Sequence, residues 1–173
     1  MLAYKRPRQP TEKDLEIMSK CLRYDATTGE LYWKNKNACA TKIGTKAYYT
    51  RPDGYRVVGI NRKQWQAGRV CWFLFYGWFP TKQIDHINRN NSDDRIQNLR
   101  VVSSKQNAQN RGKYKKQSGL PAGVSFLKGA YSARIQVNGK PTYLGCFKTP
   151  EDASAAYEKE RALLHPYYSG AAT

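Results

Sequence analysis

A dense apolar run near the middle of the chain places the strongest constraint on the fold. It reads Arg69-Val-Cys-Trp-Phe-Leu-Phe-Tyr76 and is followed by Gly77 and Pro80, residues at which helices commonly end. This pattern predicts a short buried helix that stops at Gly77. A chain of 173 residues forms one large or two small domains with modest cores. The helix is therefore expected to be the main core element and to hold the segment after it in place.

The composition is strongly basic, since 30 Lys and Arg against 13 Asp and Glu give a net charge of +17. A charge of this size opposes compaction, so a polyanionic partner is the simplest explanation. Residues 95–150 hold eleven Lys and Arg and no Asp or Glu. A membrane-surface protein would place such charge on one amphipathic helix with a wide apolar face, and no such helix is visible. Nucleic acid is therefore the expected partner, and on charge alone it could also be RNA.

Cysteine spacing and hydropathy argue against zinc-binding, disulfide-rich, secreted and membrane-spanning proteins. Cys21, Cys39, Cys71 and Cys146 form no Cys-x-x-Cys pair, and the chain has two histidines, so neither a structural zinc site nor a disulfide framework is expected. The first residues lack the apolar segment of a secretory leader, and no stretch approaches membrane-spanning length. We expect a cytoplasmic protein without membrane association.

The N-terminal part predicts a small β-rich platform. After a basic tail at residues 1–10, Thr11 can cap a helix that runs to about Leu22. Strand and turn signals then follow in order: Glu30–Trp33, the hairpin pair Asp53-Gly54, residues 55–60, and the turn Asn61–Lys63.

A group of polar residues downstream of the apolar helix carries the chemistry. Asp85 can hold a divalent metal, and the adjacent His86 can take a proton from water. Carboxamides follow at Asn98 and Asn107. These are the parts of a metal-assisted phosphodiester hydrolase. A lone Asp-His pair is commonplace and most such histidines are structural or on the surface, so the hypothesis depends on the joint occurrence of helix, pair and asparagines.

This order of residues resembles the HNH endonucleases, specifically the phage and intron-type homing endonucleases, from about Arg69 to Arg111. The resemblance implies a ββα-metal module with one divalent cation, Mg²⁺ or Mn²⁺, at the ligand positions Asp85 and Asn107. No structural zinc is expected. Asn110, three residues beyond Asn107 on the same face of the expected helix, is a weaker ligand candidate.

The resemblance also implies two catalytic roles. His86 matches the general base, whose other ring nitrogen normally donates to a backbone carbonyl across the hairpin. Asn98 matches the asparagine whose side chain ties the loop to the strand. One departure stands out, because relatives carry His-Arg before the apolar helix where this chain has Gly68-Arg69. Histidine at position 68 is expected to raise both activity and stability if this chain is a weakened nuclease.

The C-terminal part predicts a second small domain after a basic linker at residues 112–119. A hairpin signal at Asn138-Gly139 lies between alternating runs, and Thr149-Pro150 opens a helix. Residues 118–165 are similar to the AP2 DNA-binding domain, in which a helix covers one face of a three-stranded sheet and the other face enters the DNA major groove. Alternation then directs Ala133, Ile135 and Val137 toward the helix, and Ser132, Arg134 and Gln136 toward DNA.

The sequence thus predicts an α+β chain with four parts: a tail (1–10), an HNH nuclease domain (11–111), a linker (112–119) and an AP2-like domain (120–173). The predicted function is metal-dependent hydrolysis of double-stranded DNA at a site recognised partly by the C-terminal domain. A monomer would nick one strand per binding event, whereas a double-strand break would require a homodimer or a second binding event. The alternative is a catalytically silent DNA-binding protein. The expected DNA contacts are Arg69, Arg100, Arg111, Lys113, Lys115, Lys116, Ser132, Arg134 and Gln136.

Overall fold

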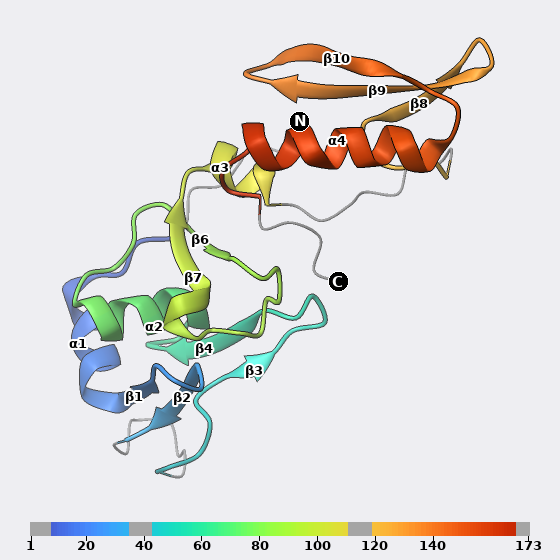
Figure 1. The fold of residues 1–173 in the computed structure, drawn as a ribbon. Coiled ribbons are helices and arrows are strands. Elements are labelled where there is room, and N and C mark those ends of the chain that lie inside the picture. Colours follow the sequence, from blue (N-terminus) through green and yellow to red (C-terminus); the bar gives the residue numbers. More distant parts are fainter. Residues whose placement is uncertain (1–7, 35–42, 111–118, 169–173) are drawn as a thin grey trace. The chain divides into compact units, whose positions relative to one another are not determined.

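The computed structural model describes residues 8–34, 43–110 and 119–168, and the chain separates into two units, Met1–Asn107 and Ala108–Thr173 (Figure 1). Several predicted features lie outside the described residues: most of the basic tail, Cys39, and nearly all of the linker with Arg111, Lys113, Lys115 and Lys116. None of the described helices is both long and apolar enough to cross a membrane.

The first helix, α1 (Glu12–Cys21), begins as predicted at Thr11. The hydroxyl of Thr11 accepts a hydrogen bond from the backbone of Asp14, whose carboxylate accepts one from the backbone of Thr11. The same carboxylate is fully buried and accepts bonds from Asn61 (2.9 Å) and Lys63 (2.7 Å). Burial alone would raise the pKa of Asp14, but these bonds outweigh it and hold the pKa well below its usual range. Asp14 thus joins α1 to the turn at residues 61–63.

The predicted platform consists of two small antiparallel sheets. Strands β1 (Leu22–Asp25) and β2 (Glu30–Trp33) form a hairpin. Its turn ends at Gly29, which has a φ of +75° and backs onto the chain at Asp94 and Arg95, so closely that a Cβ would lie 2.5 Å from the Arg95 nitrogen. The second sheet has the order β3-β4-β5, with bounds Tyr49–Thr50, Arg56–Ile60 and Lys63–Gln66.

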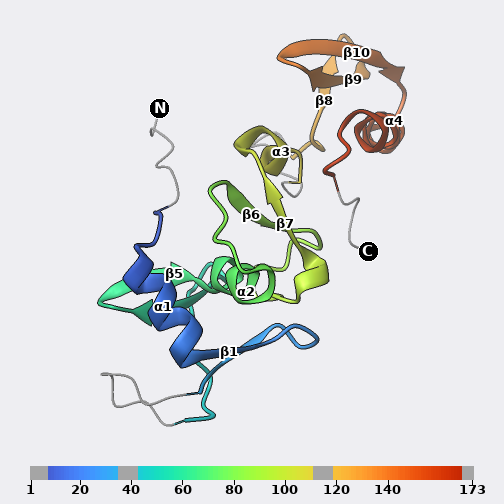
Figure 2. The same ribbon diagram turned by 90° about the vertical axis from the view of Figure 1, so that its left-hand side faces the viewer.

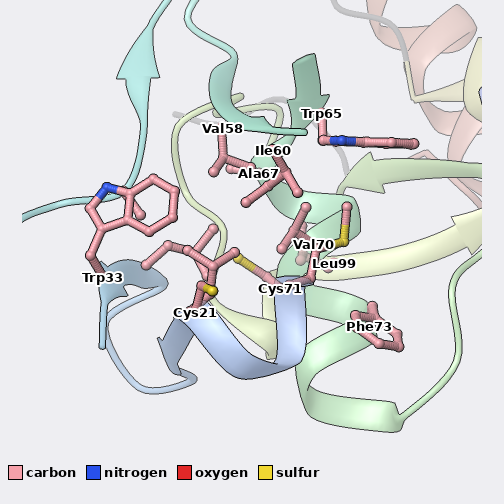
Figure 3. Close-up of a cluster of buried hydrophobic side chains, with 14 residues drawn as sticks. Cys21, Trp33, Val58, Ile60, Trp65, Ala67, Val70, Cys71, Phe73 and Leu99 are labelled. Atoms are coloured by element: carbon pink, nitrogen blue, oxygen red, sulfur yellow. The ribbon is translucent and has the colours of Figure 1, made fainter. Parts of the chain in front are cut away.

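Helix α2 (Ala67–Tyr76) is the central core element, as predicted, although it begins two residues before Arg69. It ends at Gly77, whose left-handed φ of +78° allows its N–H to donate to the carbonyl of Phe73. Figure 3 shows Val70 and Cys71 of α2 among side chains from β4, β5 and β7. Both are fully buried. The helix therefore anchors the strands that follow it.

After α2 the chain forms the hairpin β6 (Gln83–His86) and β7 (Leu99–Val102), which pair in antiparallel register, followed by α3 (Ser104–Gln109). The connection between the strands is a polar loop that ends in a single 3-10 turn, η1 (Ile96–Asn98). Leu99, at the start of β7, packs into the same core as Val70 (Figure 3). Two strands and a helix thus follow α2, in the order that the resemblance implies.

The second unit is a three-stranded antiparallel sheet and one long helix. The strands are β8 (Val124–Leu127), β9 (Ala130–Val137) and β10 (Lys140–Phe147), in the order β10-β9-β8. The predicted turn is present, since Asn138 and Gly139 both have positive φ. Helix α4 (Pro150–Leu164) runs along one face of this sheet, as both ribbon views show (Figures 1 and 2).

Candidate active site

Asp85 and His86 end strand β6, and both side chains are nearly buried, at 7% and 5% exposed. Asp85 lies opposite Arg100 of β7 in the strand register. The Arg100 Nε donates to Asp85 Oδ2 at 2.8 Å, and Nη2 lies 2.7 Å from the same oxygen. Arg100, predicted to contact DNA, therefore forms an ion pair with the predicted metal ligand in this structure.

One nitrogen of the His86 ring is held by a buried carboxylate. Its Nε2 lies 3.0 Å from Oδ1 of Asp94, which is 1% exposed. A carboxylate only accepts hydrogen bonds, so Nε2 is the donor in this contact. The edge of Tyr55 packs on the imidazole with ring centroids 6.0 Å apart.

Asn98 ties the polar loop together with three hydrogen bonds. Its Oδ1 accepts from the backbone N–H of Asn88 at 2.9 Å. Its amide donates to Asn88 Oδ1 at 3.0 Å and to the carbonyl of Asp93 at 2.8 Å. These bonds fit the positioning role proposed for Asn98, since they fix the segment that leads from His86 to Asp94.

A second group of bonds in this loop centres on the Asp93 carboxylate. It accepts from Nε and Nη2 of Arg95 at 2.7 and 2.6 Å and from the amide of Asn88 at 2.7 Å. The Arg95 guanidinium in particular lowers the pKa of Asp93 to about 2. Asp93 and Asp94 are neighbours, but only Asp94 reaches the catalytic histidine candidate.

The Asn107 side chain reaches the face of β6 that also carries Asp85, the other proposed metal ligand. The Asn107 amide donates to Oε1 of Gln83 at 2.9 Å. Gln83 and Asp85 lie two residues apart on the strand and so share a face. Within the described ranges no three His, Cys, Asp or Glu side chains gather at one point. A carboxylate and a carboxamide still suit Mg²⁺ or Mn²⁺, which prefer oxygen ligands and keep several waters. The Asp85 carboxylate already pairs with a cationic group, the guanidinium of Arg100.

The prediction that Arg69 contacts DNA is wrong, because this residue is buried. Its side chain is 4% exposed, and it donates to the carbonyls of Pro80 (2.5 Å) and Lys82 (2.9 Å). The guanidinium also stacks over the Phe79 ring, 4.8 Å from its centroid. The early start of α2 places Arg69 in the first turn of the helix, where it holds the turn between α2 and β6.

Gly68 lies inside α2 and contacts the group that holds His86. A Cβ at this position would be 2.9 Å from Asp94 Oδ1 and 3.6 Å from side-chain carbons of Ile84 and Leu99. The expectation that residue 68 precedes the helix was wrong. Asp94 was missed in the sequence, where the only available signal was a pair of acids in a polar loop.

In the second unit the predicted alternation of strand β9 is confirmed in part, but the prediction that Ser132 contacts DNA is wrong. Arg134 and Gln136 are exposed on β9, whereas Ala133 and Ile135 are buried. Ser132 is 5% exposed and so is not a DNA contact in this conformation. The reason is its place on the central strand, where a small side chain is flanked by residues of β8 and β10. Asn110, the weaker ligand candidate, is 2% exposed, which does not suit a ligand open to water and phosphate.

A comparison with protein families supports the hydrolase hypothesis. Residues 66–109 match a family model described as HNH endonuclease. Comparisons with curated proteins and with solved structures give no match. The matched segment contains Asp85, His86, Asn98 and Asn107 together with Asp94. The match supports an HNH nuclease, a hydrolase that acts on DNA.

Proposed function

We propose that this protein is a metal-dependent DNA endonuclease of the HNH type. The observation that carries the proposal is the arrangement at the end of β6, where a histidine oriented through Nε2 adjoins an acid suited to a metal. The family match over residues 66–109 supports the same reaction class. The net charge of +17 supports a polyanionic substrate.

In the proposed reaction His86 takes a proton from a water molecule. The water oxygen forms a bond to phosphorus while the bond from phosphorus to one bridging sugar oxygen breaks. A divalent cation, Mg²⁺ or Mn²⁺, held by Asp85 and Asn107 would supply charge stabilisation to the phosphate oxygens. Asn98 fixes the loop after His86 and takes no part in bond making.

Recognition is proposed to rest partly on the second unit, as an AP2-like domain would provide. Arg134 pairs in register with Tyr143 of β10, and both side chains are exposed, Tyr143 at 57%. An arginine beside an aromatic ring on an open sheet face suits binding to phosphates and bases. With one histidine base per chain, a monomer of phage or homing type would nick one strand per binding event.

The alternative function is a silent DNA-binding protein that keeps the HNH fold. The ion pair between Arg100 and Asp85 favours it, because the guanidinium occupies the carboxylate on which metal binding depends. The two functions make different predictions for the same assay.

The test is incubation of supercoiled plasmid with the full chain and Mg²⁺ or Mn²⁺. We expect conversion to open circles, loss of this activity in His86→Ala by a factor of about 10² to 10⁴, and little change in DNA affinity. The matched control is His165→Ala, which removes the other histidine of the chain. Retention of DNA without nicking by the wild type would contradict the enzyme and support the silent binder.

A further inference from the structure

The side chains of His86 and Asp94 are both buried where they meet, and residues of other elements surround Asp94. The side chains are 5% and 2% exposed, with Nε2 and Oδ1 3.0 Å apart. Placing an acid and a histidine together out of water has a desolvation cost and adds little to stability. A contact of this kind on the proposed catalytic base therefore points to a role in function.

The N-terminal platform holds the backbone of Asp94 and places a cation near its second carboxylate oxygen. Tyr24 of β1 donates its hydroxyl to the Asp94 carbonyl at 2.8 Å. Nη1 of Arg56, on β4, lies 3.9 Å from Asp94 Oδ2. Arg56 is itself held by Glu30, 3.1 Å from its Nη2, and stacks over Tyr48. These contacts leave the Asp94 carboxylate little room to turn away from His86.

Gly68 of α2 also borders the Asp94 carboxylate. A pocket of about 10 Å³ lies here, lined by residues that include Arg56, Gly68, His86 and Asp94. This volume suits a single water molecule. Because a Cβ at position 68 would stand 2.9 Å from Asp94 Oδ1, the absence of a side chain keeps the carboxylate in reach of the imidazole.

We propose that Asp94 is the positioning residue of this site, which sets the tautomer and the orientation of His86. This inference rests on the proposed nuclease function. Asp94 contacts neither substrate nor metal and acts only through His86. Its carboxylate accepts a hydrogen bond from Nε2 and so fixes both the orientation of the ring and the nitrogen that carries this proton. The N-terminal platform thereby contributes to the reaction by holding Asp94 through Arg56 and Tyr24.

The test is Asp94→Asn in the full chain, because an asparagine has the same shape but its amide can also donate to Nε2. We expect kcat for DNA nicking to fall by about 10² to 10⁴, with KM for DNA and the affinity for Mn²⁺ alone unchanged within about twofold. The matched control is Glu16→Gln, the same acid-to-amide change on the exposed face of α1.

Nitrogen NMR of the histidine rings gives a readout that a purely structural role would not change. In a His165→Ala background, which leaves one histidine, His86 should be the Nε2–H tautomer and become a mixture in Asp94→Asn. Gly68→Ala provides a second variant that keeps every polar group and presses on Asp94 Oδ1; it should change kcat and the tautomer in the same direction. An unchanged tautomer in both variants, or an unchanged kcat in a nicking enzyme, would overturn the proposal. Absence of nicking by the wild type would refute the nuclease function, while the NMR comparison would still decide the role of Asp94.

Discussion

Arg100 binds one oxygen of Asp85 with both Nε and Nη2, at 2.8 and 2.7 Å, across the β6-β7 hairpin. The carboxylate proposed to hold a divalent cation thus forms an ion pair with a guanidinium in this structure. A bound phosphate offers that guanidinium another anion. Metal binding and DNA binding are therefore expected to strengthen each other.

Arg100→Gln tests this competition. Removal of the guanidinium should increase the affinity for Mn²⁺ in the absence of DNA by a factor of about 10 or more, since a hydrogen bond to a charged group contributes roughly 1.5 to 3 kcal/mol. DNA affinity should fall. Titration calorimetry measures both, with Lys13→Gln on α1 as a control of equal charge change. Equal Mn²⁺ affinity in the wild type and Arg100→Gln would contradict the competition.

Gly68→His, which would create the His-Arg pair that the resemblance implied, should lower rather than raise both stability and nicking rate. A side chain in contact with Asp94 Oδ1, Ile84 and Leu99 overfills this region, at a cost of about 1 to 3 kcal/mol. Thermal melting and plasmid nicking measure the two effects. Gly59→His is the control, because a Cβ there has nothing within 4 Å. A faster enzyme with histidine at 68 would show that the loop can move to accommodate it.

The Asp93 carboxylate should stabilise the fold in a manner that depends on pH. Its pKa of about 2 in the folded protein, set mainly by Arg95, lies below the value of about 3.9 in an unfolded chain. The contribution is therefore fully present above pH 4 or so and is lost as the pH falls toward 2. Urea unfolding from pH 7 to 2 should show Asp93→Asn less stable at neutral pH and equal to the wild type near pH 2. Parallel curves for the two proteins would rule this out.

Arg134→Ala should weaken DNA binding and reduce the slope of log affinity against log salt by about one. Ser132→Ala on the same strand should change neither quantity, because Ser132 is buried. Fluorescence anisotropy with a labelled duplex at several salt concentrations measures both slopes. Identical slopes for Arg134→Ala and the wild type would mean that this sheet face does not approach phosphate.

Local patterns in the sequence were sufficient for most of the secondary structure. Thr11 and Gly77 mark helix ends through their own chemistry, and Asn138-Gly139 marks a turn because two residues with positive φ are needed there. The strand at residues 30–33 and the order of the three C-terminal strands also follow from short-range patterns.

The missed features depend on contacts between distant segments. Asp94 reaches His86 only because Tyr24 and Arg56 hold its loop, and no periodicity in the sequence carries that information. Arg69 illustrates the same limit. A basic residue at a helix start is expected on the surface, and only the folded structure shows that the carbonyls of Pro80 and Lys82 accept its hydrogen bonds. For Ser132, alternation assigns the face correctly but does not predict how far the neighbouring strands cover a small side chain.

The close packing of Gly29 against the backbone at Asp94 and Arg95 has a consequence for protein engineering. Residue 29 lies far outside the segment 66–109 that carries the family match, yet its turn packs against the loop whose Asp94 contacts His86. A transplant of the matched segment alone would expose that loop and leave Asp94 without its support. A portable cassette therefore has to run from the N-terminal platform to the end of α3 at Gln109, and fusion partners belong after that helix.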